Sequence, residues 1–135
     1  MPTADGSSGQ VLQTNGSGTL SFTTISSGAS SLDDLTDVKQ TNNSLFAGTI
    51  PPNWTSGAVS NTSFGIESLD AITNGDSNTA MGYRSLTAIT DGLRNTAMGQ
   101  SALKSSVSGD NTTSIGEQSL INATHDDNTA LGLYT

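Results

Sequence analysis

The sequence predicts an all-β protein, a parallel β-solenoid or β-roll of rungs about 17 residues long that follows an extended N-terminal segment. Three observations support this fold class. A five-residue phrase recurs, and its closing glycines stand at 65, 82, 99, 116 and 132, so the spacings are 17, 17, 17 and 16 residues. A leucine stands four residues after each of the first four glycines. The repeating units are rich in Gly, Asn, Ser and Thr, which disfavour helix.

Residues 1–43 lack a clear copy of the repeat and are predicted to form an N-terminal attachment segment. Residues 1–10 are mostly small and polar, as in flexible arms. Residues 9–14 and 19–24 are expected to be two strands of a β-hairpin, joined by the turn residues 15–18. For residues 32–38 we favour extended or irregular structure over a helical turn capped by Ser31.

The repeat domain is predicted to span residues 44–135, beginning with an atypical capping rung at 44–60. Gly48 stands 17 residues before Gly65, but two prolines follow it, and proline cannot donate to a β-ladder. Terminal rungs of solenoids are atypical because they close an exposed core. Phe46 and Trp54 are therefore predicted to plug the N-terminal end. The alternative is an aromatic platform that binds carbohydrate.

The regular rungs, residues 61–135, each begin with the phrase Asn-Thr-small-bulky-Gly, with Thr for Asn in the fourth copy. Alternate residues of a strand point to opposite sides, so the threonine and the bulky residue share one side. We expect this side to face the interior of the coil. The predicted core column is Phe64, Met81, Met98, Ile115 and Leu131.

A second apolar segment follows the phrase in each rung, and it is predicted to be a second strand. Its leucines extend the predicted core; they are Leu69, Leu86, Leu103 and Leu120. Turn signals end the segment at residues 74–75, 91–92 and 108–109, each with a glycine. Each rung is thus expected to read strand, bend, strand, turn.

The opposite side of the phrase carries only Ser or Ala, followed by Gly. A column without large side chains allows another backbone to approach closely. We expect this small side to contact sister chains around an axis, which makes the protein a homotrimer; the alternative is a monomeric solenoid with a narrow core. The predicted packing residues are Ala80, Gly82, Ala97, Gly99 and Gly116.

Charge and composition exclude several partners. The formal net charge is −8, with four lysines and arginines in 135 residues, so no basic patch for nucleic acid is expected. There is no cysteine and hence no disulfide. No apolar run is long enough to insert into a membrane, and the first nine residues lack the basic and apolar regions of a secretory signal.

The sequence offers little catalytic chemistry, so we expect no enzyme activity, no cofactor and no metal. It has no nucleophile elbow and no phosphate-binding loop. His125, the only histidine, is expected to be a solvated turn residue, and the adjacent Asp126 and Asp127 lack the pattern of calcium-binding β-rolls. A polysaccharide depolymerase that uses Glu67 and Asp70 as its acid pair is an alternative.

A threonine column suggests one further alternative, an ice-binding solenoid. One threonine per strand shares the side of the bulky residue, so we expect it to point inward or to cap a turn. The column is Thr62, Thr79, Thr96, Thr113 and Thr129.

The repeat also resembles a known class of sequence. The phrase Asn-Thr-Ala-Met-Gly-Tyr-Arg-Ser-Leu at 78–86, with its copies, is similar to repeats in the head domains of trimeric autotransporter adhesins and in bacteriophage tail-fibre and appendage proteins. The resemblance covers residues 44–135, with a longer period than the usual adhesin rung. It implies a parallel β-roll in which three chains pack around an axis.

Residues 9–22 and 32–38 resemble phrases of phage fibre stalks, and the missing secretory signal also favours a phage protein over an autotransporter. The resemblance implies a virion fibre that is made in the host cytoplasm. Its N-terminal segment would attach to other virion proteins, and its solenoid would act as a spacer or contact a glycan or protein of the host surface. The alternative is a fragment of a host-surface adhesin.

Overall fold

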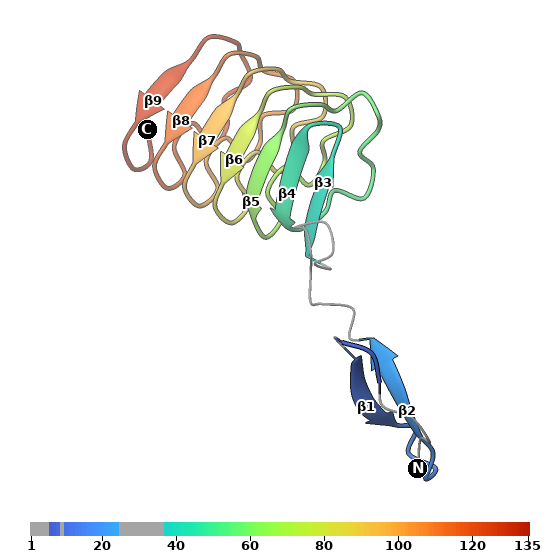
Figure 1. The fold of residues 1–135 in the computed structure, drawn as a ribbon. Helices are drawn as coiled ribbons and strands as arrows, with labels where there is room; N and C mark the ends of the chain where they lie inside the picture. The colour runs from blue at the N-terminus through green and yellow to red at the C-terminus, as the bar shows by residue number, and fades with distance from the viewer. Residues whose placement is uncertain (1–5, 9, 25–36) are drawn as a thin grey trace.

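The computed structural model describes residues 6–8, 10–24 and 37–135 (Figure 1). Within these ranges the chain forms strands and turns and no helix. The strands belong to a two-stranded sheet and a seven-stranded sheet. The protein is therefore all-β, as predicted.

The predicted N-terminal hairpin is present. Strands β1 (Gln10–Thr14) and β2 (Leu20–Thr24) pair antiparallel. The turn between them is organised by Asn15, whose Oδ1 accepts the backbone N–H of Ser17 at 2.9 Å and of Thr19 at 3.1 Å. Asparagine makes such local hydrogen bonds readily, which explains its place at the start of the turn.

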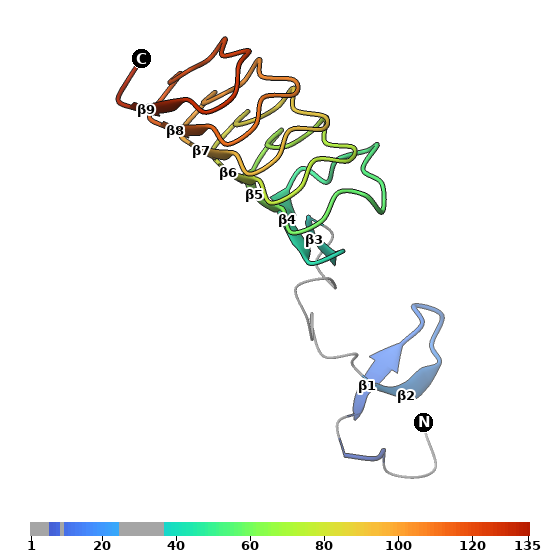
Figure 2. The ribbon, with the colours of Figure 1, turned by 90° about the horizontal axis from the view of Figure 1, so that it is seen from above.

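The seven-stranded sheet contains β3 to β9 in sequence order. Pairing of β3 with β4 is antiparallel, and every later pair is parallel. The repeat thus forms a parallel β-solenoid of about five turns with rungs about 17 residues apart. Figure 2 shows the strands lined up on one side of the coil, with the rest of each rung projecting from them. The strands are β3 (Val38–Thr41), β4 (Ser44–Gly48), β5 (Thr62–Gly65), β6 (Thr79–Met81), β7 (Thr96–Met98), β8 (Thr113–Ile115) and β9 (Thr129–Leu131).

A ladder of buried asparagines holds consecutive rungs together. The Oδ1 of Asn61 accepts the backbone N–H of Asn78 at 2.9 Å, and the Oδ1 of Asn78 accepts that of Asn95 at 3.0 Å. Each Nδ2 donates to a glycine carbonyl in the turn 14 residues later, for Asn78 to Gly92 at 2.7 Å. Both ends of the buried amide are therefore satisfied, which explains why the phrase begins with asparagine.

The glycine that closes each phrase is required by the next rung of the same chain. Gly82 has φ +130°, and a Cβ added there would lie 2.7 Å from the carbonyl oxygen of Gly99. Gly65 and Gly99 have the same conformation and an equally close neighbour. The sequence correctly predicted that another backbone segment lies close to the phrase glycine, but this segment belongs to the same chain and not to a sister chain.

The predicted second strand of each rung is wrong, because the segment consists of turns. Leu69, Leu86 and Leu103 have φ between +49° and +52°, a left-handed conformation that breaks a strand and turns the chain. Their backbone N–H groups still donate to the next rung, from Leu69 to the Ser85 carbonyl at 3.1 Å. The corner therefore continues the inter-rung ladder without strand geometry.

The leucines of these corners form the core, together with Ile72 and Ile89. Leu69, Leu86 and Leu103 have no exposed surface, and Leu120 packs against this cluster partly buried. This half of the predicted core is placed as expected.

The other half of the predicted core is wrong, because its column faces outward. Its exposed fractions are 61% for Phe64, 41% for Met81, 37% for Met98, 36% for Ile115 and 77% for Leu131. The small residues of the phrase face inward instead. The corner leucines and isoleucines already fill the interior, so the strand opposite them has room only for Ser or Ala.

The assignment of the trimer-packing residues is wrong for the same reason. Ala80 and Ala97 are fully buried inside their own chain and have no surface to offer a sister chain. Gly82, Gly99 and Gly116 stack on the glycines of the following rungs. The small side is therefore the inner face of the strand.

The N-terminal end of the solenoid is closed by β3, which covers the free edge of β4. Asn42 and Asn43, with φ +47° and +57°, form the two-residue turn of this hairpin. β3 lies within residues 1–43, so the sheet begins before the predicted boundary at 44. Of the predicted extended segment 32–38, residues 32–36 lie outside the described part of the chain.

Phe46 and Trp54 lie at this closed end. Phe46 is fully buried and pairs in register with Ser63, so its ring fills the inward position that small residues take in later rungs. Trp54 packs partly buried against the core. Both positions agree with the predicted plug.

Candidate functional site

The most distinctive surface of the solenoid is a column of apolar side chains on the outer face of the sheet. Parallel pairing places its members in register, one per rung. Neighbouring members are therefore separated by the strand spacing of about 4.8 Å. We call Phe64, Met81, Met98, Ile115 and Leu131 the apolar column.

Two further rows flank the apolar column. The threonine column lies two residues before it on the same outer side, half-buried at Thr79, Thr96 and Thr113. After each phrase glycine stands a row that begins with Ile66, which is 62% exposed, and Tyr83, which is 43% exposed. The apolar column and its two flanking rows are called the outer face below.

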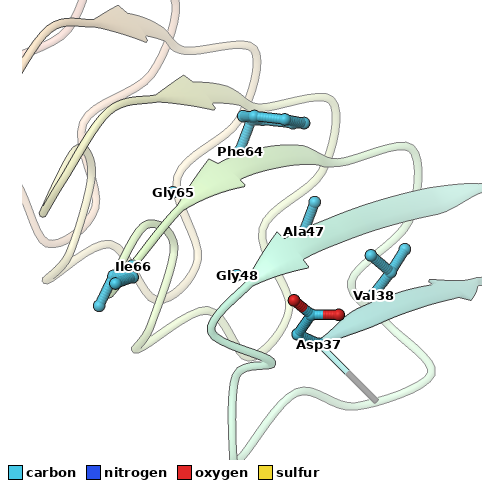
Figure 3. A pocket seen from close by; sticks show the side chains of 7 residues that line it. All are labelled: Asp37, Val38, Ala47, Gly48, Phe64, Gly65 and Ile66. Carbon is cyan, nitrogen blue, oxygen red and sulfur yellow. The ribbon is translucent and has the colours of Figure 1, made fainter. Parts of the chain in front are cut away.

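The outer face is hollowed at its N-terminal end. An open hollow of about 340 Å³ lies over β3, β4 and β5, and Figure 3 shows the side chains around it. It arises because Ala47 stands in register with Phe64, so the column drops from a phenyl ring to a methyl group. The lining residues are Asp37, Val38, Ala47, Gly48, Phe64, Gly65 and Ile66.

One ion pair fixes the side chains next to Tyr83. The Nε of Arg84 donates to Oε2 of Glu67 in the preceding rung, and the guanidinium lies 5.0 Å from the centre of the Tyr83 ring. The hydrogen bond to Glu67 and its negative charge raise the pKa of Arg84 above its ordinary value. Glu67, one of the two candidate acids, is thus placed as an ion-pair partner of arginine.

The aspartates of the turns support the backbone. Oδ1 of Asp76 accepts the N–H of Val59 at 2.9 Å, and Oδ1 of Asp110 accepts the N–H of Leu93 at 2.7 Å. His125 is exposed, with Nδ1 3.1 Å from the hydroxyl of its neighbour Thr124. Within residues 6–8, 10–24 and 37–135, no three His, Cys, Asp or Glu side chains are grouped closely enough to hold a metal ion.

The outward direction of the column was missed, although the sequence contains a signal for it. Strand alternation, continued past the phrase glycine, puts Gln100 and Glu117 on the same side as Met98 and Ile115. A glutamate without a partner does not belong in a narrow apolar interior. Both Gln100 and Glu117 are exposed in the structure.

Among the described residues there is no helix that is long and apolar enough to cross a lipid bilayer. In comparisons with protein-family models, with curated proteins and with solved structures, the chain matches none of them.

Proposed function

We propose that this chain is a non-enzymatic structural subunit of a virion fibre, in which three parallel copies associate through the outer face. The N-terminal segment attaches the fibre to other virion proteins, and the solenoid projects as a spacer or host-contact element. The observation that carries this proposal is the apolar column, which runs along every regular rung. Residues 9–22 and 32–38, which resemble phrases of phage fibre stalks, support the virion assignment.

The size of the apolar surface supports association. Eight large apolar side chains of the outer face are between 36% and 77% exposed. At roughly 200 Å² for each side chain, they leave on the order of 800 Å² uncovered. A stable interface takes about 800 Å² from each partner, whereas the largest patch of a typical monomer is about 300–600 Å². The eight residues are Phe64, Ile66, Met81, Tyr83, Met98, Ile115, Leu131 and Leu133.

The distribution of charge restricts contact between copies of the chain to the apolar and threonine columns. Each chain carries a formal net charge of −8, so two copies repel each other over most of their surfaces. The apolar and threonine columns contain no charged residue. Parallel copies in register place identical uncharged residues opposite one another, so these columns can meet without repulsion between like charges.

Light scattering coupled to size-exclusion chromatography tests the assembly directly. We expect a trimer at micromolar concentrations of the full chain. A folded monomer at all accessible concentrations would contradict the proposed association.

Attachment is tested by removing residues 1–36, which leaves β3 in place. The truncated chain is expected to remain a folded trimer but to be absent from purified particles when it replaces the full chain. Incorporation of the truncated chain at the normal level would show that attachment lies elsewhere.

One specific observation favours ice binding as a second candidate function. The threonine column lies on the outer face and not inside the coil, with one strand spacing between neighbours. Inhibition of ice recrystallisation that is lost in a Thr79→Ala/Thr96→Ala variant would favour this function over a fibre.

A further inference from the structure

We propose that Phe64 of one copy inserts into the hollow over β3, β4 and β5 of the neighbouring parallel copy. This inference rests on the proposed association through the outer face. The Phe64 contact fixes the relative height of the copies, that is, the position of each copy along the assembly axis.

The hollow has a permanent floor of backbone. Gly48 and Gly65 lie at its base, and both have positive φ, +118° and +146°. A Cβ at Gly48 would lie 2.6 Å from the carbonyl oxygen of Gly65. Stacking of the rungs therefore requires glycine at these two positions, so neither position can place a side chain in the hollow.

The walls of the hollow select an apolar group. Val38, Ala47 and Ile66 contribute aliphatic surface. The one charged lining residue, Asp37, is exposed, so its carboxylate remains hydrated. An apolar side chain without a formal charge suits this lining, because burial of a charge there would not be compensated.

Phe64 has the size and position of the inserted group. It is the single aromatic member of the apolar column and is 61% exposed. In parallel copies at the same height, the hollow of a neighbour centres one strand earlier, at Ala47, so the ring has to reach only about 4.8 Å along the assembly axis. A hollow of about 340 Å³ is as large as many small-molecule pockets and admits a phenyl ring.

In a ring of parallel copies, every Phe64 side chain and every hollow is used. Each chain donates one Phe64 and receives one, and such a head-to-tail contact generates a closed ring when the rotation between copies closes. The remaining members of the apolar column are non-aromatic side chains of similar size, so they discriminate little between neighbouring relative heights of the copies. The Phe64 contact therefore sets the register.

The test compares three variants of the full chain by light scattering over a dilution series. Phe64→Ala removes the inserted ring, and Ala47→Phe fills the hollow from within the same chain. Each single change is expected to raise the dissociation constant of the assembly about 30-fold, the effect of losing an interface anchor. The double variant restores a phenyl ring in the hollow and should recover most of the affinity.

Met98→Ala is the matched control, because it shortens the same column outside the hollow and is expected to change the dissociation constant much less. Phe64→Leu, which keeps an apolar side chain, should have an intermediate effect, and circular dichroism checks that each variant is folded. Two outcomes would overturn the Phe64 contact and leave the proposed fibre standing. In the first, the wild type is a stable trimer and neither single change lowers its affinity. In the second, both single changes lower the affinity and their losses add up in the double variant. A monomeric wild type would overturn both the contact and the proposed fibre.

Discussion

Asn78 occupies a buried position at which its side chain connects three rungs. Its Oδ1 accepts the N–H of Asn95, and its Nδ2 donates to the Gly92 carbonyl and to Oδ1 of Asn61. Asn78→Ala leaves the Asn95 N–H and the Gly92 carbonyl buried without these partners. We expect a loss of about 3 kcal/mol in unfolding free energy, measured by urea denaturation, since an unsatisfied buried group costs about 1–3 kcal/mol.

Asn122→Ala is the control for this prediction, because Asn122 is exposed in a turn of the solenoid. It is expected to change the unfolding free energy by less than about 0.5 kcal/mol, as surface substitutions do. Equal effects of the two changes would mean that the asparagine ladder does not stabilise the stack.

Gly82 is the second residue whose substitution is expected to destabilise the stack. A Cβ there would both strain the backbone at φ +130° and collide with the Gly99 carbonyl. Gly132 has a similar φ of +138°, but a Cβ there meets only the Thr135 side chain, at 3.1 Å. Gly82→Ala is therefore expected to lower the melting temperature clearly more than Gly132→Ala. If thermal denaturation gives equal losses of melting temperature, glycine is required at position 82 by the backbone conformation and not by the close approach of the Gly99 carbonyl.

At the scale of the element, β3 determines where the solenoid begins. Its antiparallel pairing covers the edge of β4, and the backbone N–H of Gly48 donates to the Asp37 carbonyl at 2.8 Å. Removal of residues 1–36 keeps these contacts, whereas removal of residues 1–43 exposes the edge. The longer deletion should melt at least about 5 °C lower than the shorter one, as a loss of about 1 kcal/mol produces in a domain of about 100 residues. Identical melting curves would show that β3 does not stabilise the sheet.

At the scale of the whole molecule, the two apolar columns of a rung have separate roles. Met81 is on the outer face and 41% exposed, while Leu86 is fully buried at the corner of the same rung. Met81→Asp is expected to leave the chain folded but to prevent association, because a charge at each copy's equivalent position creates repulsion in the interface. Leu86→Asp should unfold the chain, since it buries an unpaired charge. Circular dichroism separates the two outcomes, and unfolding by both changes would place Met81 in a structural role.

The period, the parallel stacking, the observed strands of the regular rungs and the burial of the corner leucines could all be predicted from the sequence, although the corner segment was wrongly predicted to be a second strand. These features follow from spacing, because residues one period apart must occupy equivalent places in stacked rungs. The N-terminal hairpin was also predictable, from turn residues between two short strand segments.

Which side of each strand faces inward depends on how the whole rung packs, and this packing is seen in the folded chain. Alternation along Thr79, Ala80 and Met81 separates two sides without assigning them, and the sequence indicates the direction only through Gln100 and Glu117 in later rungs. The choice depends on how much interior volume the corner residues Leu69, Ile72 and their equivalents already fill, and they come from another part of each rung. Because the coil is narrow, the alanine side fits inside and the methionine side is left at the surface, where it becomes the candidate interface.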